Sequence, residues 1–546
     1  MLNKKISRRS FLTISAMTVA SFVLDWKKIA AYAAQMGQKK KYPTVIIGAG
    51  LAGLSCGAYL SRFGIPVTVV EQHYIPGGYA TSFERSNGKF TFDVSLEGTC
   101  IHNNAAAEIL RDLGVLEKLQ LVELPEVLKI KGANFEIAVP QRDPESLIAL
   151  LSKHFPEEKE GIRGIVQEMI GILEESQKLA QQKGRISRTD FPTQYPKMWN
   201  VRDKTLADLL GSFVKNPSLQ NALSTQWGFY GLPPSKLSGF YYAIAFAEYL
   251  KNGSFYIKPR SQALSDALVS VIEASGGKVL YGTLAEKILV KDGAVTGVEL
   301  SDGKKMPARA VVSNASALTT FKEMLPHETL PPDYLKKLEE YRPSISTFIV
   351  WLGLNQELKS KFKSYKYPVT SGQGPEADYQ FSLKGDVENG TFGVTLYDNA
   401  FEDYSKPGTS TLKLLFLSGY EPWRKFEADY RAGRKEAYNK EKEKWTDILI
   451  RRAEKEVIPG LSSMIEVKDS ATPLTNWYFT RNTEGAIYGF EQSMNNAYMN
   501  RIDNRTPVKG LYLASAWGNP GGGYTAVLRS GQITFGKMME DWGSQK

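Results

Sequence analysis

The spacing of apolar positions between Thr44 and Glu71 predicts a strand, a turn, a helix and a second strand. The run from Val45 to Ile47 is typical of a buried strand, and apolar residues after Gly53 recur at helical spacing. A second apolar run, Val67 to Val70, predicts the next strand, which Glu71 follows directly. We therefore expect a βαβ unit of a Rossmann-like α/β fold.

The turn of this unit carries the GxGxxG spacing of a dinucleotide-binding loop, with Gly48, Gly50 and Gly53. Gly48 permits the tight turn, Gly50 removes a side chain where a pyrophosphate approaches, and Gly53 lets the helix pack closely on the sheet. The phosphates would lie at the helix N-terminus, where unpaired N–H groups favour negative charge. Ala49 and Ala52 complete the predicted contact.

Glu71 lies eighteen residues after Gly53, where its side chain can accept hydrogen bonds from a ribose diol. A carboxylate there would repel a 2′-phosphate, which argues against NADP. The alternative is a glycine-rich turn followed by an ordinary surface glutamate. The order of strand, turn, helix, strand and acid favours the dinucleotide site.

A second glycine pair follows in the segment IPGGYATSF, residues 75–83. Such a pair just after the ribose-binding strand is typical of FAD proteins rather than NAD dehydrogenases. Gly77, Gly78 and Ala80 are predicted to approach the pyrophosphate or ribitol, and Thr81 or Ser82 to hydrogen-bond it. A surface turn is the alternative.

Three motifs, GAGLAGL at 48–54, GGYATSF at 77–83 and FTFDVS at 90–95, resemble one group of flavoproteins. That group contains bacterial phytoene desaturases, plant carotenoid isomerases and vertebrate retinol saturases, within the amine oxidase superfamily. The resemblance covers nearly all of residues 42–540. It implies a glutathione-reductase-type FAD-binding domain interleaved with an α+β substrate domain.

Later segments extend the resemblance. Residues 258–300 look like the second flavin-domain piece, with an adenine-side contact at Ala285, and AVVSNAS follows at 310–316. Residues 510–531 are similar to the closing flavin motif, which implies contacts from Ser515, Gly523, Tyr524 and Thr525. Two departures are Ser515, where many relatives carry an acid, and the basic stretch KPRSQ at 258–262, which we expect to alter the floor of the substrate site.

The resemblance implies a division of the chain into interleaved segments. The FAD-binding domain is expected at 42–118, 255–318 and 485–546, and the substrate domain at 119–254 and 319–484. Helices are expected in the first substrate segment and mixed strands in the second.

Two aromatic stretches are candidates for contact with the substrate. Phe240 to Leu250 is apolar on nearly all sides, which predicts either a buried helix or the wall of a lipid pocket. Trp477 to Phe479 would stack beside the flavin or along a polyene, or else belong to the core. Glu97, His102 and Tyr524 are near-flavin candidates by position alone, so no catalytic acid or base is assigned.

The first 33 residues predict a twin-arginine export signal, with Arg8 and Arg9 in SRRSFL before a short apolar run. The run from Phe11 to Leu24 is shorter than the ~20 residues of a membrane span. Ala31 to Ala33 offers a cleavage site, and a solvated basic arm is the alternative. We expect the periplasm or the outer face of the cytoplasmic membrane as the location.

An exported flavoprotein lies outside the ordinary NAD(P)H pool. A membrane quinone or a small redox protein would then be the electron partner, and a redox-neutral isomerisation would need none. Half of the formal charge of +10 lies in residues 1–33, which carry six Lys or Arg and one Asp. The positive charge on the rest of the chain suits a peripheral contact with a membrane. It is too dispersed along the sequence to indicate binding of nucleic acid.

The two cysteines, Cys56 and Cys100, are expected as buried thiols, with a disulfide as the alternative. The four histidines are not clustered with cysteines or carboxylates, so no metal site is predicted.

Three functions are compatible with the residues. The first is an exported FAD oxidoreductase acting on carbon–carbon double bonds of a hydrophobic polyene or isoprenoid lipid, as a desaturase, saturase or cis–trans isomerase. The second is an amine-oxidase-like flavoenzyme. The third is a lipid-binding protein on a retained flavoprotein fold.

Overall fold

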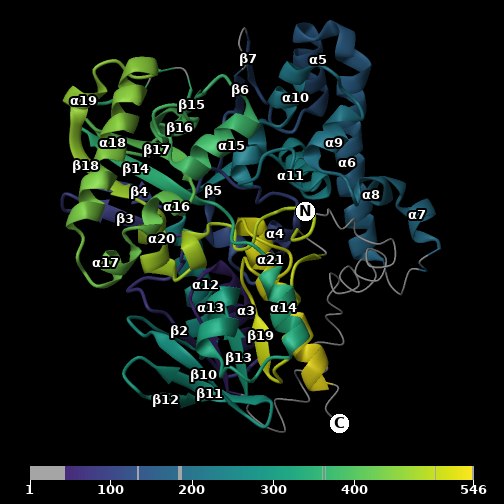
Figure 1. Cartoon of the computed structure of the whole chain (residues 1–546), viewed down its shortest axis with the longest axis vertical. Coiled ribbons are helices and arrows are strands. Elements are labelled where there is room, and N and C mark those ends of the chain that lie inside the picture. Colours follow the sequence, from purple (N-terminus) through teal and green to yellow (C-terminus); the bar gives the residue numbers. More distant parts are fainter. Residues whose placement is uncertain are drawn as a thin grey trace.

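The computed structural model of the protein describes residues 43–131, 135–182, 187, 189–359, 361–362, 364–497 and 500–543. Three parts meet at the centre of the molecule: a parallel sheet with its helices, a helical part, and an antiparallel sheet with its own helices (Figure 1). The predicted export signal at residues 1–33 lies outside the described residues. Among the described helices, none has both the length and the apolar character needed to cross a membrane.

The parallel sheet has five strands in the spatial order β19-β13-β1-β2-β9. Their bounds are β1 Thr44–Ile47, β2 Val67–Val70, β9 Lys278–Leu280, β13 Ala310–Ser313 and β19 Leu511–Leu513. Helix α3, Leu51–Arg62, joins β1 to β2, so the predicted strand–turn–helix–strand unit is confirmed. The sheet takes its strands from three segments that are far apart in the sequence.

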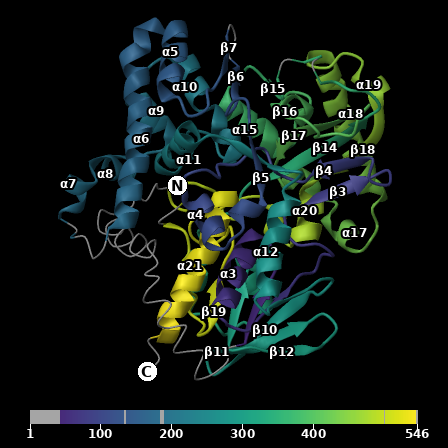
Figure 2. The same ribbon diagram turned by 180° about the vertical axis from the view of Figure 1, so that it is seen from behind.

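Two different layers cover the faces of this sheet, which explains why its strands are apolar at nearly every position. Ile46 packs with helices α3, α12 (Gln262–Ala274) and α21 (Tyr524–Gly543), which lie together in Figure 2. Val45 and Ile47 pack instead against an antiparallel sheet of order β10-β11-β12. Its strands are β10 Ala285–Lys291, β11 Ala294–Leu300 and β12 Lys305–Pro307.

The helical part is built from residues 144–252, whose apolar faces share one core. Its helices are α5 Pro144–His154, α6 Lys159–Gln181, α7 Phe191–Gln194, α8 Pro196–Val201, α9 Leu206–Gly211, α10 Pro217–Leu223 and α11 Gly239–Asn252. Two small antiparallel pairs border it: β5 Gln120–Glu123 with β8 Phe255–Lys258, and β6 Lys129–Lys131 with β7 Glu136–Ala138. Helix α4, Ala105–Asp112, packs against α21.

The second sheet is antiparallel and has the order β15-β16-β17-β14-β18. Its strands are β14 Ser346–Leu354, β15 Lys366–Val369, β16 Phe392–Thr395, β17 Ser410–Ser418 and β18 Ile465–Ala471. The accompanying helices are α15 Pro375–Lys384, α16 Glu421–Arg424, α17 Glu427–Arg431, α18 Glu436–Glu456, α19 Leu461–Met464 and α20 Pro473–Thr480. Helices α13, Ala317–Thr319, and α14, Pro332–Glu339, and the hairpin β3 Ser82–Arg85 with β4 Phe90–Asp93 complete the fold.

Strand β14 is buried at every position, because one of its faces packs in a hydrophobic core and the other borders a cavity. Phe348 packs against Trp423 and Trp445 in the core beneath the helices of this part. Thr347 and Ile349, on the opposite face, border the central cavity of the molecule. The sheet therefore forms both a core and one wall of that cavity.

The contact between α3 and α21 generates a prediction about stability. A Cβ atom on Gly531 of α21 would lie 2.5 Å from the Ala52 carbonyl oxygen and 2.7 Å from the Cys56 backbone nitrogen. Because backbone atoms cannot give way, Gly531→Ala should destabilise the fold by about 1–3 kcal/mol and lower the melting temperature.

Gly211→Ala is the matched control, because the nearest atom to a Cβ on that helical glycine is 4.0 Å away. It should leave the melting temperature unchanged or raise it. Equal melting temperatures for Gly531→Ala and the unmodified protein would contradict the close packing of α3 on α21.

Candidate active site

The carboxyl ends of the parallel strands open onto one cavity of about 1840 Å³. Its walls include the loops that follow β1, β2 and β13, residues of α6 and α11, and strands β14 to β17. A pocket for a single small ligand has a volume of ~300–1,000 Å³. This cavity is therefore large enough for a dinucleotide and a second ligand beside it.

The loop after β1 is packed so tightly that a side chain has no room at Gly50 or Gly53. Gly48 has a φ of +96°, in the left-handed region that favours glycine. A Cβ on Gly53 would lie 2.4 Å from the Gly48 carbonyl oxygen, and one on Gly50 would lie 2.4 Å from Oδ1 of Asn314. Backbone atoms of the loop thus border the cavity directly, as a pyrophosphate site requires.

Glu71 holds this loop and keeps acceptor capacity toward the cavity that it lines. Its Oε2 accepts from the Ala49 N–H at 2.7 Å, and its Oε1 accepts from the His73 N–H at 2.8 Å. Burial raises the pKa of this carboxyl above its ordinary value, whereas the backbone hydrogen bonds lower it. Since each carboxylate oxygen has a second lone pair, the side chain can still accept from a ribose diol.

Most of the cofactor-binding residues predicted from the sequence border the cavity: Gly48, Gly50, Ala52, Glu71, Gly77, Gly78, Ala80, Ala285, Gly523, Tyr524 and Thr525. The structure places the others behind its walls: Ala49, Gly53, Thr81, Ser82 and Ser515. Ala49 still acts on the site, through the hydrogen bond that its N–H donates to Glu71.

Thr81, Ser82 and Ser515, whose cofactor contacts stay predictions, form hydrogen bonds within the protein. The Thr81 hydroxyl donates to the Gly78 carbonyl at 3.1 Å, so it closes the second glycine turn. The Ser82 N–H donates to the side chain of Gln262, and Ser82 is the first residue of β3. The Ser515 hydroxyl accepts from the Trp517 N–H at 3.2 Å and is buried.

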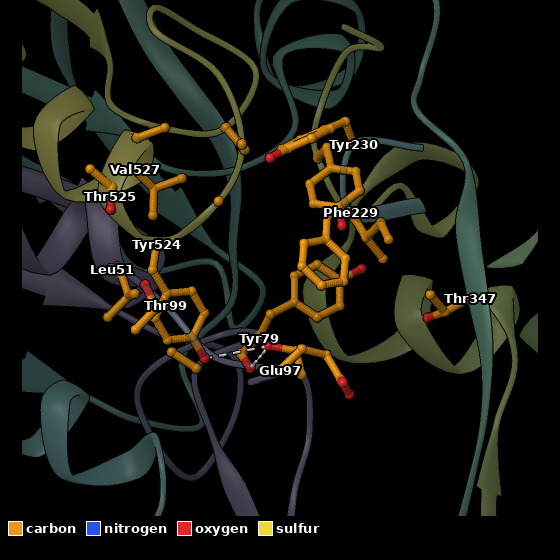
Figure 3. A pocket seen from close by; sticks show the side chains of 18 of the residues that line it. Leu51, Tyr79, Glu97, Thr99, Phe229, Tyr230, Thr347, Tyr524, Thr525 and Val527 are labelled. Atoms are coloured by element: carbon orange, nitrogen blue, oxygen red, sulfur yellow. Dashed lines mark hydrogen bonds between the residues drawn. The ribbon is translucent and has the colours of Figure 1, made fainter. Parts of the chain in front are cut away.

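The predicted closing motif also borders the cavity, and Leu51 lies beside Tyr524 in Figure 3. Helix α21 begins at Tyr524, and Gly523, Tyr524 and Thr525 line the cavity at its N-terminus. The Tyr524 hydroxyl lies 3.4 Å from that of Ser95, and the Thr525 hydroxyl donates to the Cys100 carbonyl at 3.1 Å. Burial raises the pKa of Tyr524, so its hydroxyl stays protonated at neutral pH.

Helix α11 combines the two alternatives considered for Phe240 to Leu250. Phe240, Tyr242 and Phe246 are buried in the core of the helical part. Tyr241 and Tyr249, on another side of the same helix, line the cavity. The helix is therefore a core element and a cavity wall at once.

Aromatic rings from other elements continue this wall. Phe229 and Tyr230 line the cavity and lie across it from Tyr524 and Thr525 in Figure 3. The ring of Tyr230 meets that of Tyr241 edge to face at 5.5 Å. The cavity beyond the glycine-rich loops is thus bounded by flat apolar surfaces.

Trp477 and Phe479 also line the cavity, but at the end marked by Glu71. The Phe479 ring lies 5.1 Å from that of His73, and Gln72 donates to the Phe479 carbonyl at 2.8 Å. These contacts place Phe479 beside the residues that follow β2, and its stacking on a flavin ring stays a prediction.

Glu97 lies in the cavity wall between two lysines. Its Oε2 is 2.9 Å from Nζ of Lys366, and its Oε1 is 2.5 Å from Nζ of Lys413. Although burial raises it, the two ammonium groups lower the pKa of Glu97 to about 2. The carboxylate is therefore ionised at neutral pH and cannot serve as an acid.

Three further sequence expectations have clear outcomes. His102 does not line the cavity; its ring stacks on Phe255 at 5.4 Å. The stretch at 258–262 lies outside the cavity wall, and Arg260 is buried there with donation to the Thr91 carbonyl, so it does not shape the floor. Cys56 and Cys100 are both free buried thiols, as expected.

The family model described as flavin containing amine oxidoreductase matches residues 51–534. The chain belongs to this family. It is therefore an FAD-dependent enzyme of the oxidoreductase class, and the predicted flavoprotein fold is confirmed.

Curated relatives of this flavoenzyme span most of the chain. It is 25% identical to prolycopene isomerase 1, chloroplastic, of an Oncidium hybrid cultivar over 94% of this chain and 86% of the relative. It is 24% identical to all-trans-retinol 13,14-reductase of Danio rerio over 86% of this chain and 81% of the relative.

Solved structures share the fold of the flavoenzyme at lower identity. An oxidoreductase from Methanosarcina mazei matches with a TM-score of 0.56 at 19% identity, covering 91% of this chain and 100% of that one. Putrescine oxidase bound to putrescine matches with a TM-score of 0.57 at 13% identity, covering 92% and 98%.

The residues present fit FAD. The cavity is bordered by the loop at Gly50, the buried acceptor Glu71, the second glycine pair at Gly77 and Gly78, and the N-terminus of α21. When bound, FAD supplies transfer of hydride or electrons at its ring. These residues would hold and orient the cofactor in the cavity.

Sequence reasoning missed Asn314, which connects two loops of the site. Its Oδ1 accepts from the Gly50 N–H at 3.0 Å, and its Nδ2 donates to the Ala514 carbonyl at 2.6 Å. Its place directly after β13 was the available signal, because ligands bind beyond the carboxyl ends of parallel strands. Lys366 and Phe229 had no comparable signal, since their place depends on packing between distant segments.

We predict that Gly50→Val abolishes FAD retention, because a side chain would fill the space in which the pyrophosphate approaches the loop. The measurement is the ratio of flavin to protein absorbance in the purified variant. Gly211→Ala is the control, because this helical glycine does not line the cavity and has room for a Cβ, so the variant should keep its flavin. A folded and fully yellow Gly50→Val protein would show that the site is placed wrongly.

Proposed function

We propose that the protein acts on carbon–carbon double bonds of a hydrophobic polyene or isoprenoid lipid, as a desaturase, saturase or cis–trans isomerase. The observation that carries the proposal is the continuity of the cavity, which runs from the glycine-rich loops to the aromatic wall of Phe229, Tyr230 and Tyr249. A second ligand in this space would meet both the cofactor and flat apolar surfaces.

The chemistry of the wall suits a conjugated chain. Aromatic faces bury large apolar areas and favour offset stacking or edge-to-face contact with other π systems. Tyr249 and Tyr230 are buried enough for their pKa values to be raised, so their phenols stay neutral. A rigid polyene also loses little conformational entropy in such a slot.

The two kinds of curated relatives support the same class of substrate. Their names state reactions of prolycopene and of all-trans-retinol. At 23–25% identity, this likeness supports a class of conjugated lipid and leaves the particular molecule to be identified by experiment.

The charge of the wall argues against an amine as the substrate. Lys366 lines the cavity and, beside its partner Glu97, brings an ammonium group to this part of the wall. An ammonium group placed beside it in a low-dielectric cavity would be repelled. The intact glycine loops and Glu71 argue equally against a protein that has lost its cofactor.

The decisive experiment mixes the anaerobically reduced enzyme with a set of polyene lipids and, separately, the oxidised enzyme with polyenes and amines. We expect one polyene to restore or bleach the flavin absorbance, with a product that differs by two hydrogens. For an isomerase we expect a rearranged product without net bleaching. Bleaching of the oxidised enzyme by amines, and no response to any polyene, would overturn the proposal.

We propose further that the protein is exported by the twin-arginine route and works at the outer face of the cytoplasmic membrane. A route for folded proteins would allow FAD to be loaded before export, and a membrane quinone or a small redox protein would then exchange electrons with the enzyme. The basis is the order SRRSFL before the short apolar run, residues 7–24.

This proposal predicts that the double variant Arg8→Lys, Arg9→Lys stays inside the cell. Lys4→Arg, Lys5→Arg is the matched control, because it changes neighbouring basic residues without touching the paired arginines. The measurement is the amount of folded, flavin-containing protein in periplasmic and cytoplasmic fractions. Normal periplasmic levels of the arginine variant would remove the twin-arginine interpretation.

A further inference from the structure

We propose that the lipid bound in the cavity carries a carboxylate at one end, and that Lys366 binds this group. The inference rests on the proposed function, since it adds a polar end group to the proposed polyene. It is carried by the charge trio of Glu97, Lys366 and Lys413 in the cavity wall.

The two lysines do not have the same negative neighbours. Lys413 is 5% exposed and lies near Asp93 as well as Glu97, and neither Lys413 nor Asp93 lines the cavity. Lys366 does line it, and its ion-pair partner there is Glu97 at 2.9 Å, whose side chain is 19% exposed. An anionic ligand group in the cavity would be a second partner for the Lys366 ammonium.

Of the two lysines, Lys366 is the one that reaches the cavity. Lys413 lies behind the wall, where it also donates to the Leu96 carbonyl at 3.1 Å. Lys366 lines the cavity, and its side chain is 15% exposed. Besides Glu97, its ammonium contacts the ring of Phe229 at 4.8 Å from the centroid. With three N–H donors, it retains capacity for an acceptor on a ligand.

Two other charged groups of the cavity wall have a near polar partner of their own. Lys129 is paired with Glu136 at 2.8 Å. The pKa of Glu248 is raised by burial, and its carboxylate accepts from Asn252 at 2.7 Å. Lys366 differs from these groups because its partner Glu97 also pairs with Lys413.

The position of the trio also indicates which part of the lipid reacts. Ser95, whose hydroxyl lies 3.4 Å from that of Tyr524, is two residues from Glu97. The Cα atoms of Ser95 and Glu97 are therefore at most about 7 Å apart. A carboxylate held at Lys366 would lie near the closing motif, with its apolar chain along Phe229 and the aromatic wall. The double bonds close to the polar end would then be the ones that react.

The test compares two fluorescent probes, cis-parinaric acid and its methyl ester, which differ only in the anionic end. Dissociation constants are measured with the FAD-loaded enzyme, from probe fluorescence and from the shift of the flavin absorbance. We expect the acid to bind at least about tenfold more tightly than the ester, as a charge-assisted hydrogen bond provides. Lys366→Met should remove this preference and leave the affinity for the ester within about twofold.

Lys129→Met is the matched control, because Lys129 also lines the cavity but has its own carboxylate partner. It should keep the preference for the acid. Lys366→Arg, which retains the charge, should keep most of it as well. Equal binding of acid and ester by the unmodified enzyme, or an unchanged preference in Lys366→Met, would overturn the inference.

The same measurements separate this inference from the proposed function. If neutral polyenes are converted and Lys366→Met has no effect, the carboxylate site is wrong and the proposed chemistry stands. If the acid binds through Lys366 but no polyene exchanges electrons with the flavin or isomerises, the binding site stands and the proposed chemistry fails. If neither probe binds, the carboxylate site is wrong, and the assay with the set of polyene lipids decides the proposed chemistry.

Discussion

The cavity exists because β1 pairs in parallel with β2 on one side and with β13 on the other. This pairing places the carboxyl ends of three strands at one edge, where Gly50, Glu71 and Asn314 face a common space. The hydrogen bond from the Gly50 N–H to Asn314 then joins two segments that are 264 residues apart. Every other feature of the site is arranged around this edge.

A second constraint is that several elements serve as core on one side and as cavity wall on the other. Helix α11 buries Phe240 and Tyr242 while it presents Tyr241 and Tyr249 to the cavity. Strand β14 does the same through the alternation of its side chains. The stability of the packed core therefore fixes the positions of the aromatic groups that a lipid would contact.

Charge is placed unequally in this otherwise apolar space. Glu71 brings an acceptor to the ribose end of the dinucleotide site, where backbone N–H groups stabilise its ionised form. Elsewhere in the wall, Lys366 brings an ammonium group to the cavity beside its partner Glu97. In a low-dielectric cavity, such differences select among ligands more strongly than they would in water. These two parts of the cavity therefore favour different chemical groups.

The sequence by itself determined the βαβ unit, because short-range spacing of glycines and apolar residues specifies local backbone geometry. It also predicted residues that border the cavity, but it did not reveal that the hydroxyl groups of Thr81 and Ser515 form hydrogen bonds within the protein. The tertiary structure alone decided where Glu97 and Lys366 meet, since 269 residues separate them and only the packing of two domains brings them together. Such contacts leave no periodic pattern in the chain.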